Sequence, residues 1–225
     1  MVSRDLWLSC FAPDLKPTHR RMNTRRVLRC LTTAAFAGLL SLSSWAQISI
    51  TSLPYNPAVT DFNAFNPTNS GNLTATIPTG WTAASSGTAA YNGQGTGSSA
   101  TGGYWGYGSA GNFSLGALRS GGPGNITYAV SFTNNSGATI NSITLAWDYR
   151  QYRFANTSGW DCSATGVLAG NATINSKDFT GAATGTSGAT TAVSSFTISG
   201  LTITNGQTFG FSWVTTDATS SDNGV

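Results

Sequence analysis

The sequence predicts an all-β protein in which two antiparallel sheets pack face to face as a jelly-roll-like sandwich. Several runs alternate apolar and small polar residues with a period of two, as strands with one buried face do. Clusters of Gly, Ser and Asn separate these runs, as turns do. The chain has no Glu and only 8% charged residues, which argues against amphipathic helices rich in Glu, Lys and Leu.

Residues 1–46 have the pattern of an N-terminal extension followed by a secretory signal peptide. Seven of the eleven basic residues lie there. The basic run 22–29 precedes an apolar stretch, 30–42, that is too short to cross a bilayer as a helix. Small residues at Ser44 and Ala46 fit a cleavage site. We therefore expect export to the cell surface or the medium, with no transmembrane segment in the mature chain.

Residues 47–225 are expected to form a single domain. They hold four basic and six acidic side chains, so the overall charge of +3 comes from the leader. Met22 is the more natural start of translation, with residues 1–21 as an upstream extension, and Met1 with an unusually long basic region is the alternative. Four cations are too few to bind the phosphates of a nucleic acid, and we expect no such partner. Cys162 is the one cysteine in this region, and we expect a buried, inert thiol.

The first expected strands are 48–53 and the segment of Leu73, Ala75 and Ile77. Two longer alternating runs follow, one directly before and one directly after the turn 134–137, and we expect them to form a hairpin around this turn. A bulge near Asn141 would bring Ile140 into register. The side chains expected to point inward are Ile126, Tyr128, Val130 and Phe132 in the first run, and Ile143, Leu145, Trp147 and Tyr149 in the second.

The last expected strands are 195–203 and 208–215, paired as a hairpin around Asn205-Gly206. Their inward side chains would be Phe196, Ile198, Leu201, Ile203, Phe209, Phe211 and Trp213. Two segments rich in small residues, Ser85–Gly103 and Ala183–Ala192, are expected to be surface loops. No helix is expected after the leader.

An ordered set of motifs resembles a β-sandwich module that recurs in bacterial exported and surface proteins, often beside C-terminal sorting anchors or lamin-tail-like domains. The motifs are IPTGWT at 77–82, TGGYWGYGSAG at 101–111, SLGALRSG at 114–121, the run 126–153 and FSWVTTDATSSDNGV at 211–225. The resemblance implies a β-sandwich without a defined activity. In that family the last motif continues into a final strand, so we expect the domain to lack this strand and to expose an unpaired edge.

Acid–base chemistry is restricted by composition. From Gln47 onward there is neither His nor Glu. This excludes Ser-His-Asp and Cys-His catalysis in the domain, and also metal sites built on imidazole. We expect no catalytic residues and a structural or adhesive module. A glycan-active enzyme that uses only Asp, such as Asp148 or Asp178, is the less favoured alternative.

A carbohydrate-binding module is the other alternative. Sugars bind to aromatic ring faces with polar groups nearby. The candidate patch combines the outward side chains Asp148, Arg150 and Tyr152 with Trp160 in the following loop. A second candidate is Tyr104 with Trp105, whose Gly neighbours would let a ligand approach. The competing interpretation is a solvated sheet surface over an aromatic core.

The segment near the end of the chain suggests a calcium site. Asp217, Asp222 and Asn223 would supply oxygen ligands of the kind that Ca²⁺ prefers. A plain polar turn is the competing interpretation, and no other cofactor is expected.

Overall fold

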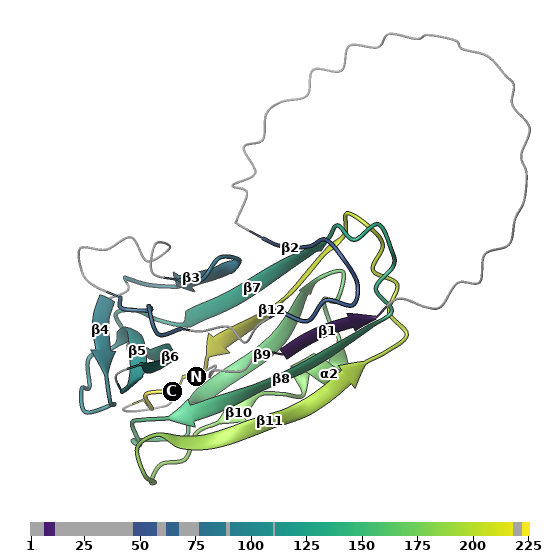
Figure 1. Cartoon of the computed structure of the whole chain (residues 1–225). Coiled ribbons are helices and arrows are strands. Elements are labelled where there is room, and N and C mark those ends of the chain that lie inside the picture. Colours follow the sequence, from purple (N-terminus) through teal and green to yellow (C-terminus); the bar gives the residue numbers. More distant parts are fainter. Residues whose placement is uncertain are drawn as a thin grey trace, which may run out of the picture.

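The computed structural model describes residues 7–11, 47–57, 62–67, 77–88, 91–109, 111–217 and 222–225. The protein is all-β, with several sheets packed together, which confirms the predicted all-β class (Figure 1). The described residues contain one helical turn, α2 (Ala172–Asn175), which Asn171 caps. The expected strand positions Leu73 and Ala75, and residues 12–46 of the leader, lie outside the described residues.

The largest sheet has the strand order β10-β9-β12-β7-β2, and β3 also pairs with β7. All its pairings are antiparallel except the one between β2 and β7. The strands are β2 (Ile48–Ile50), β3 (Trp81–Ser85), β7 (Ile126–Asn134), β9 (Gly159–Gly166), β10 (Phe179–Thr180) and β12 (Thr208–Thr215).

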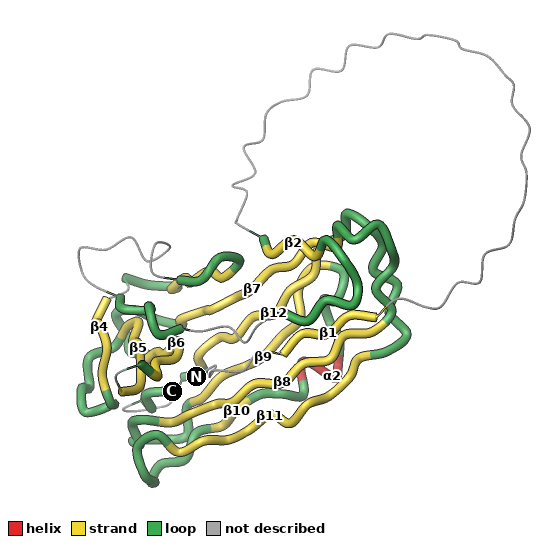
Figure 2. Tube along the Cα trace, viewed as in Figure 1, coloured by secondary structure: helices red, strands yellow, loops and turns green. Residues whose placement is uncertain are grey.

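Two smaller sheets complete the described fold (Figure 2). One has the order β1-β8-β11 and contains β1 (Trp7–Phe11), β8 (Ser142–Gln151) and β11 (Ala189–Ile198). The other has the order β4-β5-β6 and contains β4 (Tyr91–Gly95), β5 (Gly103–Ser109) and β6 (Asn112–Leu118).

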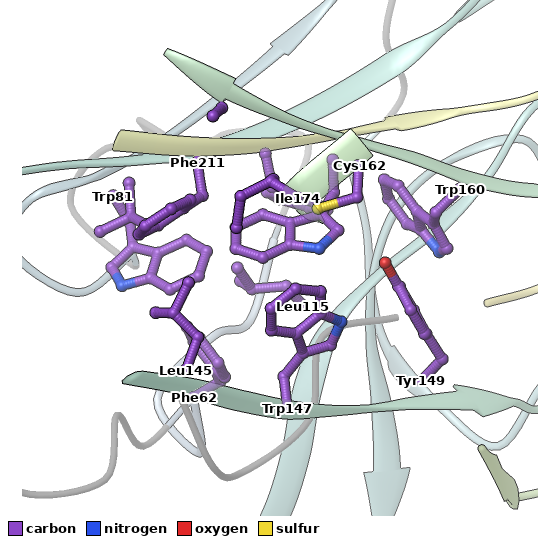
Figure 3. Close-up of a cluster of buried hydrophobic side chains, with 14 of the residues drawn as sticks. Phe62, Trp81, Leu115, Leu145, Trp147, Tyr149, Trp160, Cys162, Ile174 and Phe211 are labelled. Atoms are coloured by element: carbon purple, nitrogen blue, oxygen red, sulfur yellow. The ribbon is translucent and has the colours of Figure 1, made fainter. Parts of the chain in front are cut away.

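The predicted alternation of β7 and β8 is confirmed. Every second residue of each strand is buried, and these are the residues expected to point inward. Side chains of β8 point toward those of the large sheet across the core (Figure 3). Trp147 of β8 meets Trp213 of β12 edge to face, with ring centroids 5.6 Å apart. Aromatic pairs in this geometry stabilise a core beyond the area they bury.

The predicted hairpin between β7 and β8 is wrong, because the two strands belong to different sheets. The link between them runs from the large sheet to the sheet of β8 instead of turning back along the same sheet. Ile140 is fully buried in this link and bridges Ile203, so no bulge is needed to explain its position. Asn134 fixes the start of the crossing by donating to Ala138 O and Ile203 O at 2.7 and 2.8 Å. The two apolar faces thus meet face to face across the core.

The second predicted hairpin is wrong for the same reason. Its turn exists, since Gln207 N donates to Thr204 O at 3.1 Å and Gly206 has a φ of +84° that favours glycine. However, Ile203 pairs with Ile140, and β12 pairs with β7 and β9. The segment 199–207 is therefore a second crossing that runs beside the first.

Three element boundaries differ from expectation. The first strand ends at Ile50 rather than at residue 53. The expected loop Ser85–Gly103 contains β4, which pairs parallel with β5. The expected loop Ala183–Ala192 ends at Gly188, where β11 begins along β8. In both loops the small residues join sheets through backbone pairing, which does not require large side chains.

The last residues are packed rather than frayed. Gly224 bridges Leu118 on one side and Arg153 on the other, and Val225 exchanges two backbone hydrogen bonds with Ala117. Val225 is 3% exposed. The segment 222–225 therefore ties the small sheet to the end of β8.

Candidate binding site

The predicted patch on β8 faces outward, as the alternation of buried and half-buried residues along this strand implies. Asp148 and Arg150 lie half-buried on the outer face of β8, between the buried residues Trp147, Tyr149 and Gln151. Tyr152 follows directly after the strand and is also half-buried. The structure thus places three of the predicted site residues near one end of the strand.

The other three aromatic predictions are wrong as surface residues. Trp160 lies in β9, not in a loop, and is 1% exposed against Tyr128, with ring centroids 5.8 Å apart. Tyr104 and Trp105 lie in β5 and are 3% and 8% exposed. A ring buried on this scale cannot offer its face to a sugar. They pack against other aromatic side chains, Tyr104 and Trp160 on Tyr128 and Trp105 on Tyr107.

Tyr152 is the outer member of a row of three stacked rings. Trp105 stacks on Tyr107 at 5.7 Å, and Tyr107 stacks on Tyr152 at 5.4 Å. The Trp105 indole is fixed by donation to Thr101 O at 3.0 Å. The row therefore holds the partly exposed Tyr152 ring in a set orientation. No local pattern in the sequence places Tyr107 beneath Tyr152.

The two segments rich in small residues meet beside Tyr152. Ser187 donates to Thr96 O at 2.9 Å, which joins the loops 181–188 and 96–102. A Cβ on Gly97 would collide with the Tyr152 backbone, and one on Gly188 would lie 3.6 Å from its ring. Glycine is therefore required at Gly97 for this close approach. The loops form a rim around the exposed part of the tyrosine.

Two arginines and a phenol carry unused hydrogen-bond donors near this ring. The Nε atoms of Arg150 and Arg153, and the hydroxyl of Tyr107, are buried without a hydrogen-bond partner among the described residues. Arg150 also donates weakly to Asn112 Oδ1 at 3.4 Å. Burial raises the pKa of Tyr107, against the opposing effect of Arg153, so its hydroxyl stays protonated. The cluster of Tyr107, Arg150, Tyr152 and Arg153, called the Arg–Tyr cluster below, suits an acceptor group such as a carboxylate.

The residues of the predicted calcium site have separate contacts. Asp217 is exposed and forms an ion pair with Arg119. Asn223 is buried, and its Oδ1 accepts from the backbone of Ala155 and Asn156 at 2.7 and 2.9 Å. Asp222 is buried beside it in the chain. Within the described residues, no three His, Cys, Asp or Glu side chains group as metal ligands do.

The carboxylates named for an Asp-only enzyme do not meet in a cleft on the described surface. Asp148 lies on β8, whereas Asp178 accepts from the backbone of Cys162 in β9 at 2.7 Å. Burial, and next the charge of Asp178, raise the pKa of Asp161. Burial raises the pKa of the Cys162 thiol to about 12, with the Asp178 charge as the second cause. As expected, Cys162 is buried and forms no disulfide.

A groove also lies on the outer face of the large sheet. Its lining consists of Gln47, Gly80, Thr82, Ala129, Val130, Ser131 and Thr165. The lining is small and uncharged, so it offers hydroxyl and amide groups but no ring and no cation. The Arg–Tyr cluster is therefore the better candidate site.

The fold and this cluster define an all-β sandwich with a compact aromatic and cationic patch at one end of β8. Comparison of the chain with protein-family models, with curated proteins and with solved structures found no match. The resemblance to the bacterial exported module therefore stays a prediction. No helix in the described part of the chain is long and apolar enough to cross a membrane.

Proposed function

We propose that the chain is an exported, non-enzymatic β-sandwich module of a bacterial surface or extracellular protein, with a structural or adhesive role. The observation that carries this proposal is how the side chains divide between the faces of the sheets. Aromatic residues fill the interior, while the outer faces carry hydroxyls that bond to each other, as in Ser163 with Ser212 and Thr144 with Thr197, both at 2.8 Å. Such faces keep a sheet solvated with few charges.

The test of export is the N-terminus of the chain after expression in a bacterial host. We expect the protein outside the cytoplasm, with Gln47 as its first residue, because Ser44 and Ala46 fit the cleavage pocket. An Ala46→Arg variant should stay unprocessed, since a long charged side chain does not fit that position. Cytoplasmic protein that starts at Met1 or Met22 would contradict the proposal.

A second function, binding of an acidic glycan, is favoured by the Arg–Tyr cluster. The stacked, half-buried Tyr152 ring offers an apolar surface for a sugar ring, and the half-buried side chains of Arg150 and Arg153 offer guanidinium donors for a uronate carboxylate. Gly188 places no side chain against the ring, whereas Gly97 packs against the Tyr152 backbone. This proposal deepens the predicted adhesive role. It leaves out the buried residues Trp160, Tyr104 and Trp105 and adds Arg153, while the buried Tyr107 only supports the Tyr152 ring from below.

Electrophoresis in gels that contain polygalacturonate tests this binding, with neutral dextran gels as the reference. We expect retardation by polygalacturonate that falls as salt rises, because screening weakens charge pairing. Tyr152→Ala should abolish it and Arg150→Gln should weaken it, whereas Tyr152→Phe should retain it because the ring stays in place. If the ratio of mobility in polygalacturonate to mobility in dextran is the same for the wild type and all variants, this function is removed.

A further inference from the structure

The edge of β8 opposite β11 carries a strand from outside the predicted domain. β1 (Trp7–Phe11) lies in the leader and pairs antiparallel with Ser142–Ala146. β11 occupies the other edge along most of β8. The domain thus relies on a segment far away in the sequence to complete this sheet (Figure 1).

The same edge has a second antiparallel neighbour at its other end. Gln151 O accepts from Gly188 N, and Tyr152 N donates to Gly224 O, both at 2.8 Å. The C=O and N–H of one peptide unit point in opposite directions, so Gly224 lies on the side away from the strand β11. Gly224 also forms an antiparallel bridge with Arg153. Because both Gly224 and β1 pair antiparallel with this part of the chain, the two segments run along the edge in the same direction.

The two halves of this edge differ in chemistry. One half, 147–151, has no partner strand on this side among the described residues, and it carries Asp148 and Arg150. Charged side chains of this kind protect an open edge from association. The half under β1, Ser142–Ala146, has no charge, and its Ile143 and Leu145 are fully buried. Without β1, this half would be an unprotected edge of a two-stranded layer, which is marginal in water.

We propose that Ser142–Ala146 of β8 is a strand-acceptor site. In the full chain the leader segment Trp7–Phe11 occupies it. Removal of the leader opens the site, which can then take up the segment Trp7–Phe11 again as a separate peptide that binds antiparallel to β8 by backbone hydrogen bonds. Only the removal step rests on the proposed export; the acceptor site itself does not.

Amide hydrogen exchange of the full chain tests the site. Ser9 is the register partner of Thr144, and a proline there has no N–H for the ladder. We expect Ser9→Pro to speed exchange in 142–146 at least tenfold while β7 (Ile126–Asn134) stays protected. Ser9→Ala, which keeps the N–H, should behave as the wild type. A synthetic peptide of residues 4–13, added to Ser9→Pro, should restore protection, and a scrambled peptide should not.

Unchanged protection of 142–146 in Ser9→Pro, or no effect of the peptide on a variant that has lost protection, would overturn the proposal. If Ser9→Pro loses the protection of β7 as well, a second measurement decides. A protease site placed between Ala46 and Gln47 is cut after the chain has folded. The leader fragment should then co-purify with the domain and be displaced by excess peptide of residues 4–13. If the leader fragment separates from the domain at once and exchange in 142–146 stays unchanged, the proposal is also overturned.

Discussion

At the scale of single residues, Asn223 shows how a polar side chain can hold a β-sandwich together. Its oxygen accepts from two backbone amides and its Nδ2 donates to Ser158 O at 3.0 Å and to Asn156 O. These bonds fix the loop 155–158 from the far end of the chain. A buried amide with its groups in use stabilises the fold, whereas the same groups left unpaired would be costly. This accounts for Asn223 without a metal ion.

Cys162 gives a prediction of pH dependence at the same scale. The pKa of its thiol is raised by burial, so the folded state keeps the proton that the unfolded chain loses. Its contribution to stability is therefore complete below the unfolded pKa of about 8.5 and is lost as the pH rises from there toward the folded value. Wild type should lose stability relative to Cys162→Ala by up to about 1.4 kcal/mol per pH unit above that point.

Urea unfolding of wild type and Cys162→Ala between pH 7 and pH 10 measures this difference. Alkylation of the folded protein at pH 8, followed by peptide mass spectrometry, is the companion measurement and should leave Cys162 unmodified. Stability curves that stay parallel over this range, or rapid alkylation of Cys162 in the folded state, would contradict the assignment of a buried, protonated thiol.

At the scale of elements, backbone approach decides where the short strands can pair. β10 has only two residues, and it pairs with Gly159 and Trp160 of β9. Gly159 faces Phe179 O so closely that a Cβ would lie well inside 3.0 Å of this backbone oxygen. The glycine is thus required by contact between strands, because backbone atoms cannot move aside as a flexible side chain can.

We predict that Gly159→Ala destabilises the protein by about 1–3 kcal/mol, the usual cost of overpacking. The matched control is Gly121→Ala, because nothing lies within 4 Å of a Cβ at Gly121. The control should change stability by less than about 0.5 kcal/mol, as exposed substitutions do. Chemical denaturation of both variants measures the difference, and equal stabilities would show that β10 does not pack as described.

The sequence predicted burial at this scale better than pairing. Phe132 and Trp147 could be placed in the core because alternation is a local property of each strand. The partner of a strand is not local, and the runs around Phe132 and Trp147 alternate in the same way in a hairpin or across two layers. Trp160 was misplaced because it follows a Ser- and Asn-rich stretch that resembles a loop. The Arg–Tyr cluster was found in part, since no local pattern brings Tyr107 under Tyr152.

At the scale of the whole molecule, two of the chain crossings between the sheets lie side by side, 135–141 and 199–207. They carry the chain between the large sheet and the sheet of β8, and Ile140 and Ile203 join them through backbone hydrogen bonds of 3.0 and 3.2 Å. Alternating strands on both sides then enclose one aromatic core (Figure 3). The strand order, more than any single contact, distinguishes this sandwich from a stack of hairpins.

Backbone nuclear Overhauser effects in the isotope-labelled protein test this strand order. We expect cross-strand contacts of β7 with β12, such as Phe132 with Phe209, and of β8 with β11, such as Tyr149 with Thr191. We expect none between the backbones of β7 and β8. A ladder of contacts that joins β7 to β8 around the turn 134–137 would contradict it.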